Sequence, residues 1–321
     1  MILIFSQTED FSTDNVVAWL RHNNVKFVRI NEDAVNLLEN IKISNDGVFI
    51  KFKTEYINLD TVSAVWYRRG ALYFYSNIHE FDNRGESVRQ QIAKHVSSES
   101  KSLSEFIFSL LESKYVIGNP NHYNTNKLES LYIAQKMGLN IPETLVTTKS
   151  TDVKSFSKNS EGGIISKTIQ STFDIKIEDR VHSIGTVSVD DSIEADFYYS
   201  LFQKKINRFC EVRVFFIEDE YYPMAIFVDD SLTDARSLSL GGQRARLVPH
   251  RLPHDVLSKL KLVMKAKKLT TGSVDLILSK EGEYYFLEVN PVGQYDYLEF
   301  NCNYPIAQIL AQKLYMHEAV I

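Results

Sequence analysis

The sequence contains only two cysteines, Cys210 and Cys302, among 321 residues. A fold held together by disulfides is therefore excluded, because such scaffolds are small and dense in cysteine. We expect both cysteines to be buried apolar residues. No apolar run approaches the roughly 18 residues that a membrane-spanning helix needs. The first residues also lack the basic segment of a secretory signal. We therefore expect a folded cytoplasmic protein with no membrane partner.

Basic residues are also fewer than acidic ones. The 36 Lys and Arg residues are outnumbered by 41 Asp and Glu residues, which gives a formal net charge of −5. Nucleic-acid binding requires a basic face, so this balance argues against a nucleic-acid partner. The sequence has no Gly-x-x-x-x-Gly-Lys phosphate loop, no Gly-x-Gly-x-x-Gly, no Cys-x-x-Cys and no His-Glu-x-x-His. The familiar short motifs for phosphate, dinucleotide and zinc chemistry are therefore missing.

The first hundred residues alternate between strand and helix patterns. A short apolar strand at 2–5 and a second strand at 26–30 flank a helical pattern for which Thr13 or Asp14 is a suitable N-cap. A strand–helix–strand unit predicts a parallel sheet. We expect further strands at 47–52 and 62–67 and a polar helix at 86–112.

Gly118 and Pro120 interrupt the pattern and predict a domain boundary near residue 118. Beyond it the strand patterns become hairpins, the clearest of which joins 212–217 to 222–228. The fold class expected is mixed α/β and α+β. The expected parts are an N-terminal α/β domain at 1–118, a central lobe at 119–202 and a C-terminal antiparallel lobe at 203–321.

The last hairpin of the chain carries the most specific chemistry. Its two strands flank a turn at 281–282. If this turn has two residues, Asp275 lies directly opposite Glu288. Asn290, two residues further along, then shares their face. Three oxygen donors on two neighbouring strands are ligands that Mg²⁺ prefers.

An exposed acidic strand face is the alternative interpretation of this hairpin. A different turn length or a bulge would slip the register by one residue and turn Asp275 to the other side. We favour a metal site because the other face is apolar and an uncompensated carboxylate pair would be costly there. The apolar face is expected to comprise Val274, Leu276, Tyr285, Leu287 and Val289.

Several segments together resemble the ATP-grasp ligases. Leu-Glu-Val-Asn-Pro-Val-Gly-Gln at 287–294, after Gly-Ser-Val-Asp at 272–275, is similar to the magnesium-binding end of that family. Lys127 resembles the first ATP-binding lysine, and Lys167 resembles the second, which binds phosphate. The remaining matches are to the hinge whose backbone holds adenine (Gln203, Lys204, Lys205 and Ile206) and to the acidic-x-Arg strand after it (Glu211 and Arg213).

Two further segments resemble one subgroup, the graspetide synthetases. These are Val-Trp-Tyr-Arg-Arg at 65–69 and Asn-Pro-Val-Gly-Gln at 290–294. The subgroup makes ω-ester or ω-amide cross-links in ribosomal peptides, and the resemblance is to its grasp-with-spasm peptide maturases, related to the microviridin ligases. The chain differs from many ATP-grasp enzymes at 168–172, where Thr-Ile-Gln-Ser-Thr stands in place of a glycine-rich phosphate loop.

The resemblance implies an ATP-dependent, ADP-forming ligase, often a homodimer, with ATP and Mg²⁺ as cofactors. Its partner would be a ribosomal precursor peptide, in which an Asp or Glu carboxylate is phosphorylated and then attacked by a Ser, Thr or Lys side chain. Asp275, Glu288 and Asn290 would bind Mg²⁺. Arg213 would stabilise the transferring phosphoryl group, and Arg236 and Arg246 would reach the acyl phosphate from a loop rich in Ser and Gly.

Residues 174–196 contain seven acidic and two basic residues, a surplus equal to the net charge of the whole chain. In the microviridin ligases the corresponding region forms a hairpin that binds the leader peptide. By resemblance, an acidic hairpin would attract a basic leader. A solvated loop is the alternative. The residues implied are Asp190, Asp191, Glu194 and Asp196.

Two other functions stay open from the sequence. One is an ATP-grasp ligase that adds an amino acid to a protein or a small carboxylate. The other is a nucleotide-binding or peptide-binding module that has lost catalysis. The presence of both lysines and of Asp275, Glu288 and Asn290 argues against the second.

Overall fold

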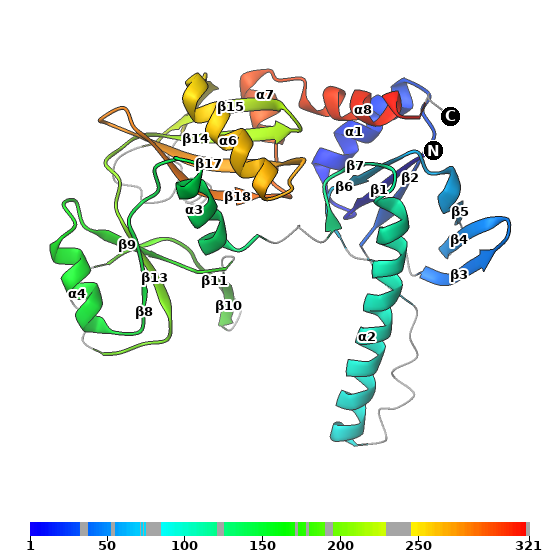
Figure 1. Cartoon of the computed structure of the whole chain (residues 1–321), viewed down its shortest axis with the longest axis horizontal. Coiled ribbons are helices and arrows are strands. Elements are labelled where there is room, and N and C mark those ends of the chain that lie inside the picture. The colour runs from blue at the N-terminus through cyan, green and yellow to red at the C-terminus, as the bar shows by residue number, and fades with distance from the viewer. Residues whose placement is uncertain are drawn as a thin grey trace. The chain divides into compact units, whose positions relative to one another are not determined.

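The computed structural model describes residues 1–32, 38–52, 55–70, 72, 74, 85–120, 125–170, 173–177, 180–189, 195–228 and 245–318. The chain forms two compact units (Figure 1). Unit 1 comprises Met1–Tyr123 and Pro305–Ile321, and unit 2 comprises Asn124–Tyr304. No helix within the described ranges is both long and apolar enough to cross a membrane.

Unit 1 is built on a four-stranded parallel sheet with the order β2-β1-β6-β7. Every residue of its central strand β1 is buried, as expected for a parallel strand that is covered on both faces. The predicted strand–helix–strand unit is therefore confirmed. The strands are β1 (Ile2–Ser6), β2 (Phe27–Asn31), β6 (Ala64–Tyr67) and β7 (Tyr115–Ile117).

Helix α1 (Phe11–His22) begins earlier than the sequence pattern predicted. Its N-cap is Asp10, whose carboxylate accepts a hydrogen bond from the Thr13 amide at 3.3 Å. The predicted cap at Thr13 or Asp14 is therefore wrong, and both residues lie in the first turn. Three of the four residues after Asp10 can also cap a helix, so the local sequence does not single out one start.

A small antiparallel sheet, with the order β3-β4-β5, also belongs to unit 1. The predicted strand at 47–52 is its central strand, β4 (Gly47–Phe52). The sequence analysis did not predict the flanking strands β3 (Leu38–Ser44) and β5 (Glu55–Asn58). A short 3₁₀ helix, η1 (Leu59–Thr61), leads back to the parallel sheet.

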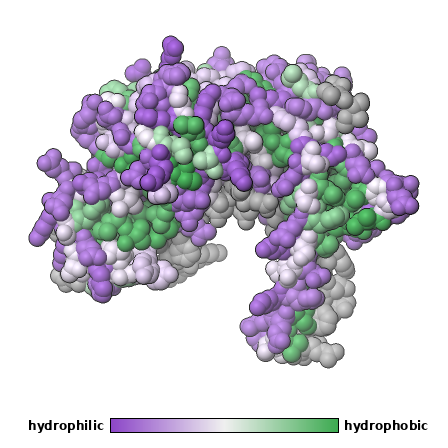
Figure 2. All heavy atoms as spheres, viewed as in Figure 1, coloured by the Kyte–Doolittle hydropathy of each residue, from purple (hydrophilic) through white to green (hydrophobic). Residues whose placement is uncertain are grey.

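Two further helices complete unit 1. Helix α2 (Glu86–Leu111) buries only Ile107 and Leu111 and extends away from the parallel sheet (Figure 1). Figure 2 shows a largely hydrophilic surface along α2 with apolar side chains among the polar ones. The C-terminal helix α8 (Ile306–Met316) packs against α1. Its contacts group residues 305–321 with unit 1 rather than with the preceding lobe, and the expected boundaries at 118 and 202 stay predictions.

In unit 2 one sheet has the order β12-β9-β13-β8. Its strands are β8 (Thr144–Thr147), β9 (Ile164–Lys167), β12 (Val187–Val189) and β13 (Ser200–Lys204). Helix α4 (Ser150–Lys158) covers it through Val153, which packs with Ile164 and Phe202. The hairpin of β10 (Phe173–Ile177) and β11 (Arg180–Ile184) lies between β9 and β12 in the sequence.

The second sheet of unit 2 is antiparallel, with the order β16-β15-β14-β17-β18. Its strands are β14 (Arg208–Ile217), β15 (Glu220–Phe227), β16 (Arg246–Pro249), β17 (Thr271–Ser279) and β18 (Tyr284–Asn290). The predicted hairpins are confirmed. Helices α3 (Lys127–Lys136) and α6 (His254–Ala266) bury one face of the sheet, and α7 (Asp296–Cys302) follows β18.

The two cysteines are both buried and free, as predicted. Burial raises the pKa of the Cys210 thiol to about 11, and burial also raises the pKa of Cys302. A thiol of such high pKa is protonated at neutral pH and is a poor nucleophile. Neither cysteine is therefore a candidate for covalent chemistry.

Candidate active site

Three charged residues form a row across three neighbouring strands of the antiparallel sheet. Arg213 on β14 is paired with Asp275 on β17, and Asp275 is paired with Glu288 on β18. Directly opposite residues project to the same face of a sheet. Their sequence neighbours Val212, Val214, Val274 and Val289 lie in the hydrophobic core. The charged row therefore occupies the face opposite to the one that α3 and α6 cover.

The predicted pairing of Asp275 with Glu288 is confirmed, but two irregularities produce it. Near the turn, Leu276 pairs with Phe286, one residue away from the predicted register, because the connection is longer than two residues. A bulge between Asp275 and Leu276 then leaves Leu287 as an extra residue and restores the register. The two shifts cancel at the acidic pair.

The bulge also changes which side chains face the core. Phe286 is fully buried in the core, whereas Tyr285 and Leu287, expected there from simple alternation, are only half-buried and lie outside it. That part of the predicted apolar face is therefore wrong. Val274, Leu276 and Val289 are buried as predicted.

Each carboxylate of the row has a cationic neighbour. The Arg213 Nε lies 3.6 Å from Asp275 Oδ1, and the Lys127 Nζ lies 3.3 Å from Glu288 Oε2. All four side chains are mostly buried, with exposed fractions between 15% and 26%. Like charges on directly opposite strand positions repel, so these two cations stabilise the acidic pair. The guanidinium of Arg213 also lies 5.5 Å from the ring centre of Tyr297 on α7, a contact that the sequence analysis did not predict.

Lys127 reaches this row from the first residue of α3. The side chain of Asn126 caps the helix by accepting a hydrogen bond from the Glu129 amide. Lys127 Nζ also donates to the carbonyl of Thr168 at 3.1 Å, directly after the end of β9 at Lys167. The structure therefore places Lys127, the first predicted lysine, beside the acidic pair. It also places Lys127 beside the segment that carries Lys167, the second predicted lysine.

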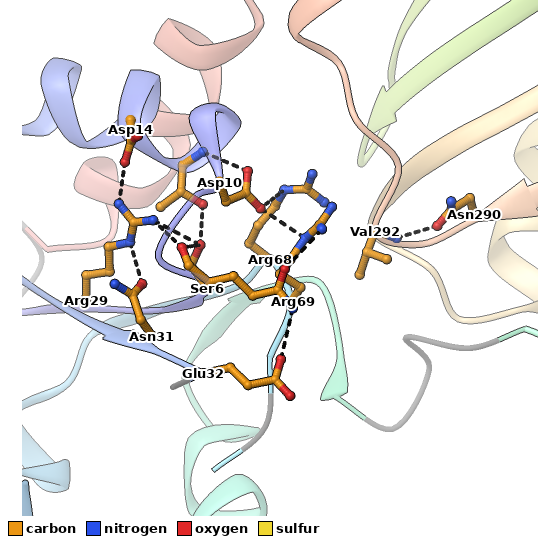
Figure 3. Close-up of polar contacts among 12 residues, drawn as sticks. Ser6, Asp10, Asp14, Arg29, Asn31, Glu32, Arg68, Arg69, Asn290 and Val292 are labelled. Carbon is orange, nitrogen blue, oxygen red and sulfur yellow. Dashed lines mark hydrogen bonds and ion pairs between the residues drawn. The ribbon is translucent and has the colours of Figure 1, made fainter. Parts of the chain in front are cut away.

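Asn290 lies at the end of β18, opposite Ser273 on β17. Its side-chain oxygen accepts a hydrogen bond from the Val292 amide at 3.1 Å (Figure 3). Two glycines allow the chain to approach closely here. A Cβ on Gly293 would lie 2.2 Å from Ser273 Oγ, and a Cβ on Gly272 would lie 2.6 Å from the carbonyl oxygen of Asn290.

An oxygen-only donor set is present, and it fits a magnesium ion better than a transition metal. No group of three or more His, Cys, Asp or Glu residues suited to a metal occurs in the described part of the chain. A metal at Asp275 and Glu288 would therefore need the amide oxygen of Asn290 and oxygens from substrate. Mg²⁺ is usually bound in this way, by one or two carboxylates with phosphate oxygens and water.

The predicted hinge begins at the end of β13. Gln203 is buried, and its side-chain amide donates to Thr144 Oγ1 at 3.0 Å. The backbone amides of the next two residues donate to other carbonyl groups, from Lys204 to Glu143 and from Lys205 to Gly163, each at 3.0 Å. An adenine held by this segment would therefore hydrogen-bond backbone groups other than these two amides. The segment continues to Ile206, which is half-buried.

The two predicted arginine positions on the C-terminal sheet are not brought together. Arg213 stands in the charged row with Asp275. Arg246 begins the edge strand β16 opposite Phe227, on the core-facing side of the sheet, and its guanidinium lies 5.8 Å from that ring. Glu211 forms an ion pair with Arg208 on its own strand. Arg236 lies outside the described residues.

Three of the four predicted leader-binding residues, Asp190, Asp191 and Glu194, also lie outside the described residues. The fourth, Asp196, caps α4. Its carboxylate lies 2.5 Å from Lys149 Nζ and accepts a hydrogen bond from the Ser150 amide at 3.3 Å. The hydrogen bond from Lys149 lowers the pKa of Asp196, and the same contact raises the pKa of Lys149. Asp196 therefore has a structural partner in a remote part of the sequence.

The comparisons with known proteins agree with these features. Residues 1–124 match the family model described as the MvdD pre-ATP grasp domain. The macrocyclase MdnC of Microcystis aeruginosa MRC, solved with its precursor peptide MdnA, is 25% identical, with a TM-score of 0.77 over 98% of this chain and 99% of that one. A RiPP-associated ATP-grasp ligase of Chryseobacterium gregarium, solved with ADP and a leader and core peptide, is 24% identical. Its TM-score is 0.79 over 98% of this chain and 96% of that one.

The chain has an ATP-grasp fold. The fold class predicted from the motifs is thus confirmed, as is the resemblance to the graspetide synthetases. The ATP-grasp ligase PsnB, solved with a precursor variant, Mg and ADP, is 18% identical, with a TM-score of 0.73 over 98% of each chain. No curated protein sequence matches the chain at a significant level.

The ATP-grasp site geometry predicts the effect of neutralising either carboxylate. Asp275→Asn or Glu288→Gln should weaken Mg²⁺-ADP binding by about 100-fold or more. Replacing a residue that only holds a metal ligand in place lowers metal affinity by about 10–100-fold, and losing a ligand itself should cost at least as much. Isothermal titration calorimetry measures the affinity. Glu281→Gln makes the same change of charge at the exposed tip of the same hairpin and should bind as wild type. Unchanged affinity in Glu288→Gln, with the fold intact by circular dichroism, would contradict the site.

Proposed function

We propose that the protein is an ATP-dependent ligase that installs ω-ester or ω-amide cross-links in a ribosomally made precursor peptide. The charged row of Arg213, Asp275 and Glu288, together with Lys127 beside it, is the observation that carries this proposal. It lies on a fold shared along nearly the whole chain with MdnC and with the Chryseobacterium gregarium ligase. Both of those proteins were solved with peptides, and the second also with ADP.

Asp275, Glu288 and Asn290 would hold Mg²⁺ through their side-chain oxygens. The presence of Mg and ADP in the PsnB structures supports this assignment. Bound with ATP, the metal would neutralise phosphate charge in the phosphoryl-transfer step. The nucleotide's adenine would be held by backbone groups of the segment from Gln203 to Ile206, next to Glu211.

The chain's own cations have two successive roles in this proposal. In the structure, Lys127 and Arg213 lie beside the two carboxylates and offset their negative charge. When a triphosphate arrives, Lys127 and Lys167 would bind its phosphate oxygens, and Arg213 would stabilise the phosphoryl group as it leaves. The roles expected for Arg236 and Arg246 at the acyl phosphate stay predictions.

In the net reaction the peptide loses one water for each cross-link formed. The terminal phosphoryl group of ATP moves to an oxygen of an Asp or Glu side chain, which gives an acyl phosphate and ADP. A Ser or Thr hydroxyl, or a Lys amine, then attacks the acyl carbon and loses its proton, while phosphate leaves with the bridging oxygen. Water hydrolyses an acyl phosphate, so the site must exclude water.

The mass of the product tests this function against its alternatives. A short peptide encoded beside the gene, with repeated Thr or Ser and Glu or Asp near its C-terminus, should lose the mass of one water per cross-link when incubated with ATP and Mg²⁺. Mass spectrometry and an ADP assay measure the two products, and Asp275→Asn should form neither. A gain of mass would instead support an amino-acid ligase, and no peptide-dependent ADP would support a module without catalysis.

We also propose that the acidic residues between β12 and β13 attract a basic leader peptide. Residues 174–196 contain seven acidic residues and only two basic ones, which supports this proposal. The predicted hairpin in this region is also present, as β10 paired with β11. A charge-steered contact weakens with added salt because exposed charges are screened.

Neutralising Asp190, Asp191 and Glu194 together to Asn, Asn and Gln should therefore weaken leader binding about 10-fold at low salt and less at high salt. Fluorescence anisotropy of a labelled leader measures this. Glu161→Gln, an exposed acid elsewhere in unit 2, serves as the matched control, and Asp196→Asn is made separately because Asp196 caps α4. An affinity that is the same in the triple variant and wild type at low salt would exclude this leader site.

The homodimer that the resemblance implies and the cytoplasmic location expected from the sequence also stay proposals. Sedimentation velocity distinguishes a dimer from a monomer.

A further inference from the structure

The carboxyl end of the parallel sheet in unit 1 contains a polar cluster that the proposed function leaves unused. From β1 the chain goes first to β2 on one side and later to β6 on the other side of β1. The order of the strands therefore reverses between β1 and β6. In open parallel sheets, ligands bind beyond the carboxyl ends of the strands at such a reversal.

Two arginines that follow β6 contact one aspartate that follows β1 (Figure 3). The Nε atoms of Arg68 and Arg69 lie 3.3 Å and 3.0 Å from the same Asp10 Oδ2. The side chains of Arg68 and Asp10 are each only 4% exposed, whereas that of Arg69 is 26% exposed. Arg68 and Asp10 therefore form a buried support, and Arg69 is the member of the cluster that solutes can reach.

A neutral amide oxygen accepts a hydrogen bond from Arg69. Arg69 Nη1 donates to the side-chain oxygen of Gln7 at 3.3 Å, and the amide nitrogen of Gln7 donates to Glu32 at 3.1 Å. Gln7 is exposed, and its oxygen has the shape of a carboxylate oxygen but no charge. A carboxylate in its place would form a charge-assisted and bidentate contact with the guanidinium, which is stronger than the bond from an amide.

The third arginine of the cluster has its own partners. Arg29 lies 2.5 Å from Asp14 Oδ1 and donates to Asn31 Oδ1 at 2.7 Å and to the carbonyl of Gln7 at 2.5 Å. Asp14 thus neutralises Arg29, and Asp10 is shared between two arginines. Of the three arginines, Arg69 has the most exposed side chain, at 26% against 16% for Arg29 and 4% for Arg68.

We propose that Arg69, supported by Arg68 and Asp10, binds a carboxylate of the peptide substrate by displacing the side chain of Gln7. This inference rests on the proposed function, because that reaction requires a substrate rich in acidic side chains. The side-chain carboxylate of a Glu or Asp residue and the carboxyl terminus of the peptide share this chemistry, and the experiment separates them.

The first experiment tests the binding site without activity. The full chain, labelled with ¹⁵N in its arginines, is titrated with glutarate and followed through the Nε–H signals by NMR. The Arg69 signal should move and saturate with glutarate and should not move with the neutral isostere glutaramide. Arg89, an exposed arginine paired with Glu86 on α2, is the matched control and should stay unchanged. An unchanged Arg69 signal, or equal shifts for Arg69 and Arg89, would overturn the proposal and leave a structural ion cluster.

The second experiment uses peptide kinetics. Arg69→Gln should raise the KM of the acidic peptide by about 10- to 100-fold, the range expected for one lost bond to a charged group, with little change in the KM of ATP. Arg69→Lys should restore only part of this loss because it cannot bind a carboxylate bidentately. Gln7→Glu should also raise the peptide KM, since it places a competing carboxylate on Arg69. Arg89→Gln should match wild type.

Two peptide variants identify the source of the carboxylate. If a side chain binds Arg69, a C-terminal amide leaves the peptide KM unchanged, and replacing an acidic residue outside the cross-links with Gln raises it. The reverse pattern assigns the carboxyl terminus. A peptide KM that is the same in wild type, Arg69→Gln and Gln7→Glu would overturn the proposal. If wild type forms no cross-link at all, the proposed function fails, while the glutarate titration still decides whether the site exists.

Discussion

The structure of the candidate site depends on one electrostatic constraint, the juxtaposition of Asp275 and Glu288 on neighbouring strands. Two mostly buried carboxylates at opposite positions repel, and burying such a pair without a compensating charge is costly. Each carboxylate has a cation beside it: Arg213 on β14 lies next to Asp275, and Lys127 on α3 lies next to Glu288. The same two carboxylates are the natural ligands of a hard cation. The arrangement that stabilises the two carboxylates is therefore also the arrangement that a magnesium-bound triphosphate would use.

Backbone irregularities place these groups as much as the side chains do. The bulge at Leu287 corrects the register that the longer turn displaces, and without it Asp275 would not face Glu288. Gly272 and Gly293 allow the chain after β18 to pack directly on β17, which holds Asn290 at the end of the row. These three positions explain why the motif needs its glycines and its spacing.

Local patterns in the sequence predicted much of this arrangement. Alternation and turn spacing predicted the hairpins and the acidic pair, because each depends on neighbours in the sequence. The ATP-grasp fold was predicted from the resemblance of several separate segments to that family. The prediction of the Asp275–Glu288 pair nevertheless succeeded through two shifts that cancel. Other features depend on contacts between remote segments, which leave no local pattern: the Lys149–Asp196 pair, the packing of α8 in unit 1 and the core-facing position of Arg246. The N-cap of α1 was mispredicted for a local reason, since several adjacent residues can cap a helix.

Anomalous diffraction from crystals grown with ADP and Mn²⁺ tests the central claim most directly, because manganese replaces magnesium in oxygen-ligand sites. The account predicts an anomalous peak coordinated by the carboxylates of Asp275 and Glu288 at about 2.1 Å, close to the phosphates of the nucleotide. A nucleotide bound with its manganese on other residues would contradict it.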